Sequence, residues 1–466
     1  MRDVLDICQA ATRGNIVSEQ DFDLDHVYLT ASMLVTKYGL VFEPTNPVPS
    51  DDGLADRLWQ AAVEFFVDCG VYFKDEQRIV KFSREEVESA LASYSGQCHF
   101  GQGPEARVFT SRKPDSDARP WCHVGAGTVS STEEYAAAVV RGNASIAAAD
   151  SMSVPALDCV DGFPIVAGTP AEIRGAIRSI QVARQACVDA GRPGLPIING
   201  VAAAGTARGT IAASSHASGW RESDCVIVGT LAEFKTSTEM MSKVVWCQES
   251  PTRSVLASAP IMGGFVGGPE AMAVINAAYA IWCVLVYQAD YYLTLPMDLR
   301  MGCGTTREVL WATSLSHQAI ARNTNVPTLA LPYANGGPMT EQYYHEAAAA
   351  TIAAVASGVS FQTTHPAGAL FADFLTPMEM RGCVEIGLGS VGMTRKDAST
   401  IVHELLNRYE GKLGDPDRGV PFPECFDVKT GQPTADHVKL VEKTKEQLRN
   451  VGVQFAPAER CEAATL

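Results

Sequence analysis

From Trp121 onward, short apolar runs alternate with alanine-rich stretches at intervals of about 30 residues. Apolar runs without polar alternation are typical of parallel strands that are buried on both faces. Parallel neighbours need a crossover, which is usually a helix. Candidate strands lie at 121–125, 151–157, 195–199, 224–229, 254–259, 291–295, 328–332 and 359–363. Helical spacing between them is clearest at 132–148, 170–190, 305–322 and 339–356.

Eight strands with helical crossovers predict an α/β fold of the (β/α)8 TIM barrel type. The alternative is an open, doubly wound parallel sheet, but no G-x-G-x-x-G opens a helix after the first strand. We expect the barrel to occupy residues 116–392. Residues 1–115 are predicted to form a mainly helical cap or subunit-contact region, and residues 393–466 to form helices packed on the barrel.

The flanking regions carry their own helix signals. Residues 51–70 place apolar side chains on one helical face and end on Gly70. Ser83 and Glu86 have the spacing of a capping box, and residues 71–82 between the two helices predict a hairpin. After the last strand, 378–387, 395–409 and 435–451 read as amphipathic helices.

Composition narrows the class of function. The net charge of −16 argues against nucleic-acid binding, because a phosphate backbone has to be met by lysine and arginine. The thirteen cysteines form no CxxC pair and no apolar leader opens the chain, so we expect a soluble cytoplasmic protein. The apolar stretch 271–287 is shorter than a membrane span and contains Asn276, so it predicts a buried helix.

The run 194–200 delivers one polar residue, Asn199, to the carboxyl end of a predicted buried strand. In barrels of parallel strands, the chemistry takes place at that end. The other polar groups predicted at the same face are His123, Asp158, Asp161, Glu233, Glu270, Asp298, Arg300, Tyr333, Asn335, Glu341 and His365. His123 and His365 with a carboxylate would make a metal site, but no metal-binding spacing supports it, and we predict none.

Glycine pairs follow several of the predicted strands. Glycine lets backbone or a flat ligand approach closely, and helix amino ends offer N–H donors. We therefore predict contact with a cofactor at the six glycines Gly263, Gly264, Gly267, Gly268, Gly336 and Gly337.

Blocks along nearly the whole chain resemble the monomethylamine:corrinoid-protein methyltransferases of methanogenic archaea. The blocks are KYGL (37–40), CGVY (69–72), RIVK (78–81), GRPG (191–194), GGFVGG (263–268), TRE (306–308), GPMTE (337–341) and ECFDVKT (424–430). Each block alone is weak evidence for the resemblance, but the order and spacing of all the blocks along the chain are specific to the family.

The resemblance implies a homohexameric barrel that transfers a methyl group from methylamine to the Co(I) corrinoid, a cobalamin-type cofactor, of a small partner protein. It implies no tightly bound cofactor in this chain. It also implies a pyrrolysine, whose position falls on Asn199, give or take one residue. Two glutamates and a glutamine associated with it fall near Ile227, Ala257 and Leu331.

Those replacements predict a non-pyrrolysine homologue with a changed methyl donor. A quaternary ammonium suits an apolar or aromatic pocket, which Tyr333, Phe265 and Phe361 would supply, with Asn199 orienting the substrate. A methylthio or methoxy donor would need an acid, for which Glu341, His365 and Asp158 are the candidates. The alternative function is a catalytically silent barrel that serves binding or assembly. No membrane partner is expected.

Overall fold

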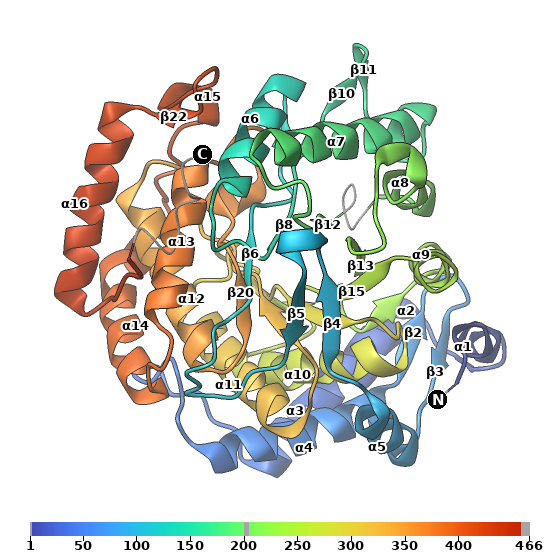
Figure 1. Cartoon of the computed structure of the whole chain (residues 1–466). Helices are drawn as coiled ribbons and strands as arrows, with labels where there is room; N and C mark the ends of the chain where they lie inside the picture. Colours follow the sequence, from blue (N-terminus) through green and yellow to red (C-terminus); the bar gives the residue numbers. More distant parts are fainter. Residues whose placement is uncertain (1, 200–204, 458–466) are drawn as a thin grey trace.

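The fold is built on one eight-stranded sheet in which every pairing is parallel (Figure 1). A computed structural model describes residues 2–199 and 205–457. In spatial order the strands are β12 (Ile198–Asn199), β13 (Cys225–Gly229), β15 (Arg253–Ser258), β17 (Tyr291–Thr294), β19 (Thr328–Ala330), β20 (Ser360–Gln362), β6 (Cys122–Val124) and β8 (Ser151–Met152). Each predicted run contains or overlaps one of these strands, so the α/β class is confirmed.

The two strands at the ends of this order, β8 and β12, meet through a thin seam. Met152 forms a parallel bridge with Ile197, and the Met152 amide donates to the Pro196 carbonyl oxygen at 3.0 Å. By contrast, β13 and β15 share a ladder that runs from Cys225 to Gly229. The seam is therefore a single bridged pair, whereas even the short ladders of the sheet, such as β20 with β6, join two residue pairs.

One helix follows each strand of the sheet. These helices are α6 (Glu133–Ala144), α7 (Pro170–Asp189), α8 (Ala207–Ala213), α9 (Thr238–Glu249), α10 (Pro269–Leu285), α11 (Arg307–Asn323), α12 (Glu341–Ala356) and α13 (Pro377–Gly389). The apolar stretch at 271–287 is α10, which is buried on all sides as predicted. Among the described residues, no helix has the length and apolarity that a membrane span requires.

The N-terminal region packs over α10 and α11 through α4 (Asp52–Cys69), which Figure 1 shows with α3 (Thr30–Tyr38) at the foot of the sheet. The Asp51 side chain caps α4 and Gly70, at φ 70°, ends it. The predicted hairpin is β2 (Val71–Phe73) with β3 (Arg78–Val80). Strand β14 (Lys235–Thr236) adds to β2, so this region shares a sheet with the segment between β13 and α9.

A second hairpin was not predicted from the sequence. Strands β4 (Gln97–Phe100) and β5 (Arg107–Thr110) pair antiparallel and pack aromatic rings against the amino-terminal ends of the parallel strands. The Phe109 and Trp121 rings lie 5.2 Å apart, and the Phe100 and Tyr291 rings 5.9 Å apart. The region before residue 115 is therefore less purely helical than predicted, because its last part closes that end of the sheet with strands.

The C-terminal helices α14 (Arg395–Tyr409) and α16 (Ala435–Val451) pack on α12, along one side of the molecule (Figure 1). A buried pair anchors α16 to α13: His437 Nε2 lies 2.9 Å from Glu379 Oε1, and both side chains are fully buried. Burial acts to raise the pKa of Glu379, but hydrogen bonds from His437, the Met339 amide and Thr376 bring that pKa below its ordinary value.

Glu379→Gln is expected to lower the free energy of unfolding at pH 7 by about 1–3 kcal/mol, because a buried charge-assisted hydrogen bond is lost. A carboxyl with a depressed folded-state pKa stabilises the protein above its unfolded-state pKa, and this contribution disappears as the pH falls through the folded-state value. The acid decline should therefore be shallower in the variant. Urea unfolding at several pH values measures both effects, with the exposed Glu424→Gln as control. Parallel pH profiles for wild type and Glu379→Gln would refute the expectation.

Candidate active site

A cavity of about 260 Å³ lies at the carboxyl ends of the parallel strands. Most of its lining residues lie in the last part of these strands or in the loops that follow them, and Met240 comes from α9. The lining residues are Gly127, Ser153, Ile227, Gly229, Thr230, Leu231, Met240, Ala257, Ala259, Leu293, Leu295, Leu331, Tyr333, Gln362 and His365. Among these lining residues there is no aspartate, glutamate, lysine or arginine.

One wall of the cavity is aliphatic. Ile227 of β13, Ala257 of β15, Leu293 of β17 and Leu331 just after β19 line it and belong to one buried apolar cluster. The register explains why they meet, since Ala257 lies opposite Leu293 and the Leu331 amide bonds the Thr294 carbonyl. Side chains that share a register row on neighbouring strands point to the same face. This wall offers apolar surface and no hydrogen-bonding side chain.

A second part of the lining is polar but uncharged. Tyr333 and His365 pair through a backbone bridge, and their rings meet edge to face with centroids 4.8 Å apart. Gln362 Nε2 donates to the Gly125 carbonyl at 3.2 Å and lies 3.0 Å from His365 Nε2. A carbonyl only accepts, so the amide nitrogen faces it and its second N–H points at a lone pair on His365 Nε2. This arrangement places the His365 proton on Nδ1.

The electrostatics of this wall follow from burial. Burial lowers the pKa of His365 to about 3 and raises the pKa of Tyr333 to about 12. Both side chains are therefore neutral over the physiological pH range. A neutral imidazole of this kind can donate a hydrogen bond but is a poor source of a proton. The cavity can position a substrate, whereas it offers no ionised side chain among the residues that line it.

His123 is buried and bonded to Ser153, which lines the cavity, and both of its ring nitrogens have partners. Nδ1 is 2.7 Å from Ser151 Oγ and Nε2 is 2.8 Å from Ser153 Oγ. Burial lowers its pKa to about 3. Within residues 2–199 and 205–457, no three histidine, cysteine, aspartate or glutamate side chains are grouped to hold a metal ion.

Five of the predicted site residues come together in this cavity: Ile227, Ala257, Leu331, Tyr333 and His365. Asn199 is the last residue of β12, and its backbone pairs with Val226 of β13. The Asn199 side chain lies outside what the structure describes, as do residues 200–204.

The other predicted side chains lie elsewhere. Glu341 opens α12 and is bound by Lys443 at 2.6 Å, which lowers the Glu341 pKa. Asp158 is exposed in the segment after β8. Phe265 is 43% exposed on the loop before α10, and Phe361 is buried next to Gly387 of α13. Of the three aromatic rings proposed to hold a cation, Tyr333 alone lines the cavity.

The six predicted cofactor glycines line other parts of the structure. A Cβ on Gly337 would lie 1.6 Å from the Arg418 carbonyl oxygen, and one on Gly336 would lie 2.4 Å from the Tyr343 amide nitrogen. Gly263 and Gly267 have positive φ and close a turn through a 3.0 Å backbone hydrogen bond. Gly264 lies within this turn, and Gly268 caps α10. Close backbone approach accounts for glycine at 336 and 337, and the positive φ of the turn accounts for glycine at 263 and 267.

Sequence reasoning did not single out Ser153, Gln362, Met240 or Leu293, which also line the cavity. A usable signal existed for Leu293 and Gln362, because each lies inside a predicted strand and alternates with residues that face away.

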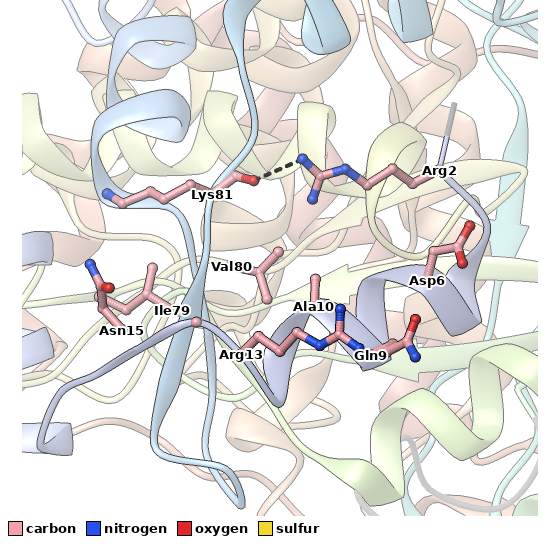
Figure 2. Close-up of a pocket in the computed structure, with 10 residues that line it drawn as sticks. Arg2, Asp6, Gln9, Ala10, Arg13, Asn15, Ile79, Val80 and Lys81 are labelled. Atoms are coloured by element: carbon pink, nitrogen blue, oxygen red, sulfur yellow. Dashed lines mark hydrogen bonds between the residues drawn. The ribbon is translucent and has the colours of Figure 1, made fainter.

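A separate open hollow of about 430 Å³ lies between α1 (Val4–Ala11) and β3, where Arg2 donates to the Lys81 carbonyl (Figure 2). It shares no residue with the strand-end cavity.

The structure thus has the features of an α/β enzyme whose substrate cavity lies at the carboxyl ends of parallel strands. Comparison with known proteins specifies the class. Residues 2–453 match the family model described as monomethylamine methyltransferase MtmB. The chain therefore belongs to the MtmB family of methyltransferases.

Alignments with individual relatives extend over nearly the full length of this chain. The chain is 28% identical over 454 residues to monomethylamine methyltransferase MtmB of Methanosarcina mazei and to MtmB1 of Methanosarcina acetivorans, covering 97% of this chain and 98% of each relative. The crystal structure of Methanosarcina barkeri monomethylamine methyltransferase superposes with a TM-score of 0.93 at 27% identity. A crystal structure of a hydroxylamine MtmB complex gives the same values, and each covers 97% of this chain and 98% of its own.

Proposed function

We propose that this methyltransferase moves a methyl group from a quaternary methylamine, such as a betaine, to the Co(I) corrinoid of a small partner protein. The observation that carries the proposal is the character of the cavity. One part of its lining is aliphatic and another part is polar but neutral, with Tyr333 and His365 as the aromatic rings.

The choice of a quaternary amine over monomethylamine rests on hydrogen bonding. Monomethylammonium brings charged N–H donors, whose strongest hydrogen bonds are made to carboxylates, whereas the lining side chains supply only neutral acceptors such as Gln362 and Tyr333. A quaternary ammonium has no N–H group, and the face of an aromatic ring attracts it within about 6 Å of the ring centroid. The cavity therefore suits a methylated nitrogen without N–H groups better than an amine that has them.

The chemistry of transfer supports the same choice. The C–N bond breaks with its electron pair left on nitrogen, and the electron pair of Co(I) forms the new bond to carbon. A quaternary nitrogen leaves as a neutral amine and needs no proton. The residues that line the cavity supply no ionisable acid active near pH 7, since His365 is neutral and the Tyr333 pKa is raised. The protein then acts mainly by positioning the methyl group.

We propose further that Asn199 stands at the position of the family's pyrrolysine and that the substrate contacts it. Ile227, Ala257 and Leu331 are proposed to replace the polar groups associated with that residue. Their common location in one cavity supports this assignment. A non-pyrrolysine member of the family would then keep the scaffold and bind a different donor.

We also propose the architecture of the whole protein from its membership of the family. The bridge between Met152 and Ile197 supports closure of the parallel sheet into a (β/α)8 barrel. We propose a cytoplasmic homohexamer in which residues 1–115 form a cap, 116–392 the barrel and 393–466 outer helices. The corrinoid would belong to the partner protein and act as methyl acceptor.

The test is a panel of methyl donors with a corrinoid protein reduced to Co(I), read by the absorbance change that accompanies methyl-Co(III) formation. Betaines or other quaternary amines are expected to react, and monomethylamine is not. Reaction with monomethylamine alone would overturn the proposal. If no donor reacted while a quaternary amine still bound, the chain would be a catalytically silent barrel that serves binding or assembly.

A further inference from the structure

Strand β12 is held by side chains as well as by backbone pairing. Its ladder to β13 contains Ile198 and Asn199, and a single bridge at Ile197 joins it to β8. At the amino-terminal side of the strand, Asp224 Oδ1 accepts from the Ile197 amide at 2.8 Å. Arg184 donates to the Leu195 carbonyl at 2.9 Å and pairs with Asp224 at 2.6 Å. These buried groups fix the first half of the segment.

The second half is fixed by a chain of hydrogen bonds that crosses the seam between β8 and β12. Trp121 Nε1 donates to Ser151 Oγ at 2.7 Å, and Ser151 Oγ lies 2.7 Å from His123 Nδ1. His123 Nε2 lies 2.8 Å from Ser153 Oγ, which donates to the Ile198 carbonyl at 3.0 Å. Ile198 immediately precedes Asn199, and Ser153 also lines the cavity.

The proton positions in this series of hydrogen bonds follow from the groups at its two ends. The Trp121 indole nitrogen can only donate, and the Ile198 carbonyl can only accept. Ser153 uses its single hydrogen on Ile198, so it must accept from His123 Nε2–H. Ser151 accepts from Trp121 and gives its hydrogen to His123 Nδ1. Every link is then satisfied with His123 as the neutral Nε2–H tautomer, which links strand β6 to the carboxyl end of β12.

We propose that Ser153 and His123 are positioning residues that set the carboxyl end of β12, and with it Asn199, against the substrate cavity. They act at the seam, where β8 and β12 share a single backbone bridge, so the side-chain links add to the strand pairing. The inference rests on the proposed role of Asn199 at the cavity. Neither residue is proposed to exchange a proton with substrate.

The test uses the full chain and three variants that remove successive links. Ser153→Ala deletes the hydrogen bond to Ile198, and His123→Gln breaks the hydrogen-bond series one step earlier. Ser151→Ala is the matched control, because it removes a buried serine hydroxyl that lies two links away from Ser153. Amide hydrogen exchange of a peptide over 195–199 is the readout, with a peptide over 291–294 as internal reference. This readout needs no substrate.

Ser153→Ala is expected to speed exchange over 195–199 by about fivefold, the effect of losing one buried hydrogen bond. His123→Gln should give a smaller increase and Ser151→Ala the smallest, with the 291–294 peptide unchanged in all three. With whichever donor reacts, Ser153→Ala should raise KM more than it lowers kcat. Equal exchange in wild type and Ser153→Ala, or an equal increase in Ser153→Ala and Ser151→Ala, would overturn the inference. If the donor panel fails, the exchange order still decides the positioning role.

Discussion

Replacing Glu346 with alanine is expected to lower the free energy of unfolding by about 3–5 kcal/mol, because several buried donors lose their acceptor and each unsatisfied group costs about 1–3 kcal/mol. Glu346 lies in α12 and is fully buried. Its Oε1 accepts from the Gly336 amide at 2.8 Å and from Gln342 at 2.9 Å. Its Oε2 accepts from the Asn335 amide at 2.8 Å and from Thr305 at 2.5 Å. Alanine would leave these donors buried without acceptors.

The matched control for this change is Glu341→Ala in the first turn of the same helix. Glu341 is partly exposed and pairs with Lys443, an arrangement that contributes at most about 1 kcal/mol. Urea or thermal unfolding of the two variants beside wild type measures both losses. If Glu346→Ala lost no more stability than Glu341→Ala, the buried carboxylate would not be what holds the 335–337 loop.

Tyr333→Ala is expected to weaken binding of a quaternary methylamine by about 30-fold, the factor that corresponds to about 2 kcal/mol of cation–π attraction in a desolvated site. Tyr333 follows β19, lines the cavity and is held edge to face by His365 at 4.8 Å. Alanine removes the aromatic face and enlarges the cavity. Calorimetric titration with a betaine or tetramethylammonium measures the change.

Tyr333→Phe is the control for the ring itself. It keeps the aromatic face and removes the hydroxyl, whose raised pKa excludes ionisation near pH 7. Affinity within about threefold of wild type is expected, since the cation–π attraction of Phe is close to that of Tyr. If Tyr333→Phe lost as much affinity as Tyr333→Ala, the hydroxyl rather than the ring would bind the donor.

Much of the fold can be predicted from the sequence, because apolar strand-like runs and helical stretches alternate regularly along the chain. The eight apolar runs and the helical stretches between them mark the alternating strands and helices, and capping residues such as Asp51 and Ser83 mark helix starts. The β4–β5 hairpin was missed, since its alternation is carried by few residues and its role depends on rings such as Trp121 and Tyr291 that are distant in sequence. Tertiary packing, which no local pattern encodes, decides such elements.

The candidate site was predictable in part because the family resemblance pointed to Ile227, Ala257 and Leu331. All three line the cavity, and they lie in or just after β13, β15 and β19 of the parallel sheet. Glu341 and the Gly336–Gly337 pair follow a strand end too, but they turn outward or meet backbone instead of the cavity. Following a strand end places a residue near the correct face, whereas the direction of its side chain depends on loop geometry.

The most direct measurement of the central claim is equilibrium binding of two amines to the purified chain without any corrinoid partner. Calorimetric titration should detect binding of tetramethylammonium or a betaine, and weaker or no binding of monomethylammonium, because the lining residues supply an aromatic face and no carboxylate acceptor. Tighter binding of monomethylammonium than of the quaternary amines would contradict the account.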